Sequence, residues 1–66
     1  MPGQVLHNIA AEAQKAISAE RLLQDCYRRM SSEAKDPKVK AVLHDLLLME
    51  EMNEILLRSI NQRVGV

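Results

Sequence analysis

Apolar residues recur at alternating steps of three and four along nearly the whole chain, and only three polar residues interrupt the pattern. In the first half the series is Ile9, Ala13, Ala16, Glu20, Leu23, Tyr27 and Met30. In the second half it is Val39, Leu43, Leu46, Glu50, Asn53, Leu57, Ile60 and Val64. Because this spacing keeps side chains on one side of a helix, it predicts two amphipathic helices. We expect them over about residues 4–33 and 37–62, and no segment has the alternation of a strand.

The junction between the two helices is marked by Asp36-Pro37. Asp is a preferred N-cap and Pro is favoured at the first helical position. The residue before a proline is also disfavoured in the α region, so the first helix should end before Asp36. A connection this short predicts antiparallel neighbours, that is, a single all-α helical hairpin over residues 1–66.

A chain of 66 residues needs further support, because so short a chain buries only about 60% of its unfolded surface. Cys26 is the only cysteine and cannot form a disulfide within the chain. We expect a homodimer, or a higher homo-oligomer, in which two hairpins make a four-helix bundle. A second apolar stripe on the second helix favours assembly beyond the dimer, although scattered surface residues of this kind can have no role. It consists of Ala41, Leu48, Met52 and Ile55.

Composition and the cysteine count bear on location and partners. A single unpaired cysteine suits a reducing compartment, and the start of the chain lacks the pattern of a signal peptide. No run of about 18 apolar residues is present, so we expect a cytoplasmic protein without a membrane segment. Nine basic residues balance nine acidic ones and Tyr27 is the only aromatic, which argues against nucleic-acid binding.

Glu20, Glu50 and Asn53 are the polar residues of the two apolar series. A buried charge is costly unless it is paired or coordinates a metal. With the turn near residue 35, Glu20 and Glu50 are equidistant from it and should lie at one level. Carboxylate oxygens suit hard divalent cations. Two other interpretations remain open: each glutamate can pair with a basic side chain of a partner, and a lone Asn can fix register and oligomeric state.

The chain resembles the ferritin-like superfamily, most closely rubrerythrin-type halves and encapsulated ferritins. The residues that carry this resemblance are Ala16-Ile17-Ser18-Ala19-Glu20, Tyr27, Asp36-Pro37 and Leu47-Leu48-Met49-Glu50-Glu51-Met52-Asn53. The resemblance implies a di-iron carboxylate site formed by four helices at a subunit interface, with ferroxidase activity. It assigns Glu20 and Glu50 as metal ligands and places Tyr27 beside them.

Asn53 departs from the family pattern, which has a histidine three residues after the second glutamate. An amide oxygen is a weaker iron ligand than imidazole. By helical phase His7 and His44 point away from both series and do not replace it. The expected site therefore has Glu20, Glu50 and Asn53 as ligands for iron or another divalent metal, with weakened ferroxidase chemistry. The alternative is a non-catalytic helical oligomerisation or interaction module in which these polar residues fix the register.

Overall fold

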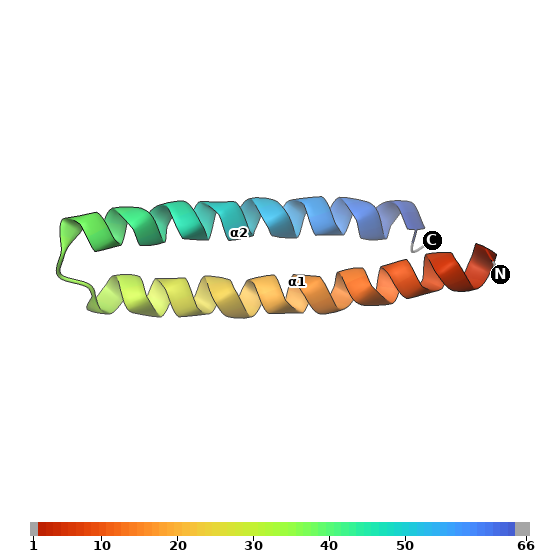
Figure 1. Ribbon diagram of the computed structural model, residues 1–66, viewed down its shortest axis with the longest axis horizontal. Coiled ribbons are helices and arrows are strands. Elements are labelled where there is room, and N and C mark those ends of the chain that lie inside the picture. The colour runs from red at the N-terminus through yellow and green to blue at the C-terminus, as the bar shows by residue number, and fades with distance from the viewer. Residues whose placement is uncertain (1, 65–66) are drawn as a thin grey trace.

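The protein is an antiparallel hairpin of two long helices, as seen in a computed structural model that describes the backbone of residues 2–64 and the side chains from Asn8 to Val64. Helix α1 spans Pro2–Glu33 and helix α2 spans Pro37–Val64. They lie side by side, with the connection at one end and both termini at the other (Figure 1). The all-α helical hairpin predicted from the sequence is confirmed, and the helices expected over 4–33 and 37–62 correspond to α1 and α2.

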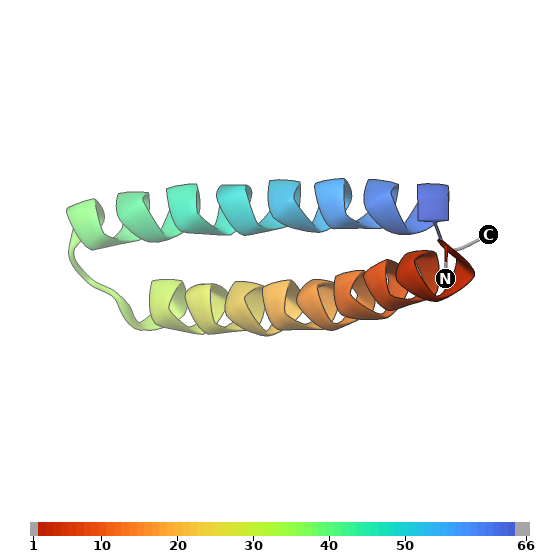
Figure 2. The same ribbon diagram turned by 45° about the vertical axis from the view of Figure 1, so that its right-hand side comes forward.

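The connection over residues 34–36 has the predicted capping geometry. The Oδ1 atom of Asp36 accepts a hydrogen bond from the amide of Lys38 at 2.9 Å, which is the bond of an N-cap residue. The Asp36 carbonyl accepts the first helical bond of α2, from the amide of Lys40 at 3.0 Å. In Figure 2 the chain crosses from α1 in an extended segment, and the first turn of α2 overhangs the last turn of α1. The extended conformation follows from the proline after Asp36.

Small and polar side chains dominate the face of α1 that contacts α2. The buried or half-buried residues of α1 are Ala10, Ala13, Ala16, Ile17, Glu20, Gln24, Tyr27 and Ser31. Ile17, with 1% of its surface exposed, is the most deeply buried of them. This face is displaced by about one residue from the predicted apolar series. Ile9, Leu23 and Met30, all in that series, remain 39–46% exposed because they lie beside the contact and not within it.

The two open flanks of the hairpin differ in chemistry. One, which we call the polar flank, carries three contacts between the helices: Gln14 with Asn61 at 3.2 Å, Arg21 with Glu54 at 3.4 Å, and Arg28 with Glu51 at 3.4 Å. The opposite side, which we call the apolar flank, is defined by helical phase. It consists of Ile9, Leu23, Met30, Val39, Val42, Leu46, Met49, Leu56 and Ile60. Apart from the half-buried Leu46, these side chains are 39–59% exposed.

The outward face of α2, away from α1, is apolar as well. Leu48, Met52 and Ile55 are 51–62% exposed there, in line with the second stripe expected from the sequence. Neither helix, over the part of the chain that the structure describes, is long and apolar enough to cross a membrane.

Removal of the Asp36 cap should weaken the hairpin. Asp36→Ala loses the side-chain bond to the Lys38 amide, and loss of such a cap costs about 1 kcal/mol. We expect this decrease in the free energy of unfolding, measured by urea denaturation followed by circular dichroism at one fixed protein concentration. Lys35→Ala in the same connection is the matched control, because Lys35 is exposed. Equal stability of the two variants would contradict the capping role.

Candidate metal centre

By helical phase, Glu20 of α1 and Glu50 of α2 belong to the side of the helix contact that is nearer the apolar flank. Both side chains are half-buried. In each, the Oε2 atom is buried and has no hydrogen-bond partner among the described residues. Removing a carboxylate oxygen from water without a partner is costly, so a ligand or partner for these two atoms would stabilise the folded state.

The two glutamates do not lie at the same level. The side chain of Gln24 reaches the Glu50 carbonyl oxygen at 3.4 Å, and Arg21 reaches Glu54. Glu50 therefore lies opposite Gln24, which is one helical turn, about 6 Å, further along α1 than Glu20. The expectation of a common level was wrong by one turn. The cause is the overhang of α2 beyond the end of α1, which shifts the pairing register (Figure 1).

Asn53 and Tyr27 are the other predicted site residues, and they differ in exposure. Asn53 is exposed, and its helical phase places it on the apolar side of α2. Tyr27 is half-buried on the face of α1 that contacts α2, two turns beyond Glu20. His44 is exposed, as expected, whereas the side chain of His7 lies outside the described residues.

Gln24 is a polar residue of this region that the sequence analysis did not single out. It is only 6% exposed. Its Nε2 atom donates to Glu54 Oε1 at 2.9 Å and to the Glu50 carbonyl oxygen at 3.4 Å. The available signal was its place at steps of four and three in a second series, Ala10, Ala13, Ile17, Glu20, Gln24, Tyr27 and Ser31. The neighbouring series, with Ile9, Leu23 and Met30, contains more large apolar residues and is therefore the stronger prediction for a buried face.

Among the described carboxylates, Glu54 has the most hydrogen-bond and ion-pair partners. In addition to the bond from Gln24, it pairs with Arg58 at 2.8 Å and with Arg21 at 3.4 Å. The bond from Gln24, followed by the bond from Arg58, holds the pKa of Glu54 below its usual value, because both favour the charged carboxylate. Glu54 is thus engaged on the polar flank, while Glu20 and Glu50 keep free oxygen atoms.

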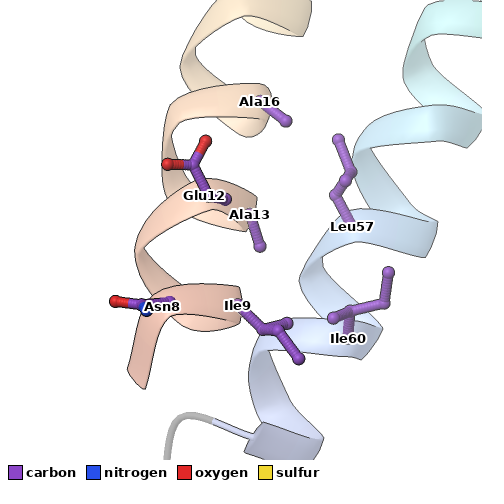
Figure 3. A pocket seen from close by; sticks show the side chains of 7 residues that line it. All are labelled: Asn8, Ile9, Glu12, Ala13, Ala16, Leu57 and Ile60. Atoms are coloured by element: carbon purple, nitrogen blue, oxygen red, sulfur yellow. The ribbon is translucent and has the colours of Figure 1, made fainter. Parts of the chain in front are cut away.

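An apolar groove opens between the helices on the apolar side, nearer the chain termini. Ala13, Ala16 and Leu57 line it together with Ile9 and Ile60, whose side chains point toward one another (Figure 3). The polar ends of Asn8 and Glu12, at its rim, point away from α2. The groove thus offers an apolar surface with polar groups only at its edge, and it is separate from the two glutamates.

The described residues of one chain do not form a metal site by themselves. Residues 8–64 contain no cluster of three or more His, Cys, Asp or Glu side chains that could hold a metal ion. Glu20 and Glu50 are chemically suited to hard divalent cations, which prefer six or more oxygen ligands. The two carboxylates have at most four oxygen atoms between them, which is fewer than such a cation prefers.

Acidification should weaken the hairpin through Glu54. Its pKa is lowered in the folded state, so its stabilising effect is present above the unfolded-state pKa of about 4.3 and is lost as the pH falls through the lower folded-state pKa. We expect the melting temperature of the wild type to fall more steeply than that of Glu54→Gln between pH 5 and pH 3, measured by circular dichroism. Glu12→Gln, at an exposed carboxylate, is the control and should keep the wild-type slope. Parallel profiles for the wild type and Glu54→Gln would exclude this role.

No protein family model matches the chain, and neither the curated proteins nor the solved structures contain a significant match. The resemblance to the ferritin-like superfamily therefore rests on the sequence pattern alone and stays a prediction.

Proposed function

We propose that two copies of this chain pair through their apolar flanks into a four-helix bundle, and that Glu20 and Glu50 of both copies bind divalent cations at the interface. The observation that carries this proposal is the pair of buried carboxylate oxygens without a hydrogen-bond partner. A cation satisfies such oxygens directly, which explains why a small helical protein has two carboxylates next to its core.

The distribution of basic residues supports this proposal. Arg21 and Arg28 reach across the hairpin, but they do so on the polar flank, where they pair with Glu54 and Glu51. Among residues 8–64, no lysine or arginine forms an ion pair with Glu20 or Glu50. The described chain therefore supplies no basic partner for these glutamates, which leaves a cation or a group of a partner chain to satisfy them.

The apolar flank supplies the reason for dimerisation. A two-helix hairpin that buries only Ala13, Ile17 and Leu43 as apolar core residues in its described part has little to stabilise it alone. Pairing of two apolar flanks would bury the large side chains left outside. A two-fold axis would also double the carboxylates to four, whose charge balances two divalent cations, and would bring the exposed Asn53 of each copy into the interface.

The choice of ion and its chemistry follow from the ligand set and the resemblance. Oxygen ligands suit Mn²⁺, Mg²⁺ and Fe²⁺, and the family resemblance favours iron. A pair of iron ions, when bound, would supply the electron transfer of a ferroxidase reaction. The role of the chain is to hold the ions between Glu20 and Glu50 and to exclude water with the apolar flank. The free, exposed Cys26 fits a cytoplasmic location.

A second candidate function is that of a helical interaction module without a metal. The exposed Asn53 on an otherwise apolar surface favours it, because a single Asn in an apolar interface can fix register and oligomeric state. In this alternative Glu20 and Glu50 would be satisfied by polar groups of the partner chain. Both candidate functions need the same apolar flank. They differ in that only the first requires a bound cation.

Metal binding should require both glutamates. We expect the wild type to bind about one Mn²⁺ or Fe²⁺ per chain, because four carboxylates in a dimer balance two divalent ions, and to melt at a higher temperature with the ion than with a chelator. The Glu20→Gln/Glu50→Gln double variant should lose both effects in anaerobic titration calorimetry and thermal melting. Glu12→Gln makes the same substitution at an exposed carboxylate, and this variant should bind the ion as the wild type does. A double variant that binds normally, or a stable wild-type dimer without ion binding, would favour the interaction module.

Dimerisation should depend on the apolar flank and not on the outward face of α2. Leu56 and Ile55 are consecutive, similar in size and similarly exposed, at 54% and 62%, but they lie on these two different surfaces. We expect Leu56→Asp to weaken the dimer at least tenfold, since a buried carboxylate is costly, and Ile55→Asp to leave it intact. Sedimentation velocity over a concentration series measures both. Equal weakening by the two substitutions would place the interface elsewhere.

A further inference from the structure

Gln24 is the one buried polar residue among the side chains that the structure describes, and it lies next to the candidate metal centre. It belongs to the face of α1 that contacts α2, one turn after Glu20. Its amide donates to two acceptors on the same turn of α2: the carbonyl oxygen of Glu50 at 3.4 Å and Oε1 of Glu54 at 2.9 Å. A single side chain of α1 is thus bonded to both ends of the α2 turn that begins at Glu50.

These bonds are the buried polar contribution to the placement of α2 along α1. The other buried residues of the described chain, Ala13, Ile17 and Leu43, are apolar, and their packing is not directional. The cross-helix pairs of the polar flank are directional, but they are exposed to solvent and contribute less. A shift of α2 by one turn would leave the Gln24 amide buried without these acceptors, at the free-energy cost of an unsatisfied polar group. Gln24 therefore favours the single register in which Glu50 lies one turn from Glu20.

The same bonds distinguish Glu54 from Glu50, the two glutamates at the ends of that turn. Glu54 is held on the polar flank by Gln24, with Arg21 and Arg58 as its further partners. Glu50 is contacted by Gln24 only at its backbone carbonyl, so its side chain stays free and its Oε2 atom is unpartnered. Glu54 is thereby engaged, and Glu51 between them pairs with Arg28, so Glu50 is the carboxylate of this turn with an unpartnered oxygen.

We propose that Gln24 is a positioning residue for the metal ligand Glu50, which it presents to a divalent cation by fixing the register of α2 and by keeping Glu54 out of the site. This inference rests on the proposed function and assigns a role to a residue outside the predicted ligand set. Residues that orient metal ligands through hydrogen bonds change metal affinity by about 10- to 100-fold when they are replaced.

The test compares two glutamines of α1. Gln24→Met keeps the length of the side chain but removes both donors, and Gln14→Met removes the bond to Asn61 on the polar flank, about 15 Å away along the helix. Mn²⁺ is the probe, followed by titration and by its electron paramagnetic resonance spectrum. We expect Gln24→Met to bind Mn²⁺ at least tenfold more weakly with an altered hyperfine pattern, and Gln14→Met to stay within twofold of the wild type with an unchanged spectrum.

The outcomes separate this inference from the proposed function. A wild type that binds no Mn²⁺ would reject the proposed function, and the positioning role with it. A wild type that binds Mn²⁺, with a Gln24→Met variant of equal affinity and spectrum, would overturn the inference on Gln24 alone. Gln24→Leu is the second variant and should behave as Gln24→Met does. Loss of helix content in both variants would assign Gln24 to folding only and would also overturn the inference.

Discussion

The narrow, partly polar contact between α1 and α2 is the constraint on which the rest of the molecule depends. Along α1 this contact consists mainly of small and polar side chains such as Ala13 and Gln24, and the side chains at a contact set how closely two helices pack. Large apolar residues such as Leu23 and Met30 lie outside it. The hairpin therefore has a small core and an exposed apolar flank, and the proposed dimer rests on this combination.

The charged side chains are also distributed unequally between the two sides of the helix contact. Cross-helix ion pairs and hydrogen bonds gather on the polar flank, where Arg21 and Arg28 meet Glu54 and Glu51. Glu20 and Glu50 lie on the other side of the contact, with buried oxygens that no basic residue of the described chain satisfies. This segregation makes the two glutamates a candidate site, because every carboxylate that bonds across the hairpin does so on the opposite flank.

The predictions from sequence succeeded where the signal was local. The cap at Asp36 and the end of α1 before it follow from the chemistry of an aspartate before a proline, which acts within a few residues. The expectation that Glu20 and Glu50 lie at one level was wrong, because their relative level depends on where α2 begins relative to the last turn of α1. The extended path of three linking residues determines that offset, and no residue pattern within either helix records it.

The choice of the contact face shows a similar limit. Two overlapping series at steps of three and four run along α1, and the more apolar one contains Leu23 whereas the other contains Gln24. Apolar content alone favours the first as the core. In the structure the second faces α2, because Gln24 gains two hydrogen-bond acceptors there and the small alanines allow the helices to meet.

The sequence by itself determined two long helices, a short capped connection and a pair of glutamates within apolar surroundings, because helical periodicity and capping are properties of neighbouring residues. Only the tertiary structure decided which face of each helix meets the other, that Gln24 bridges them, and that Glu54 is engaged while Glu20 and Glu50 are not. Those outcomes depend on the register and rotation of one helix against another, which residues far apart in the chain decide together.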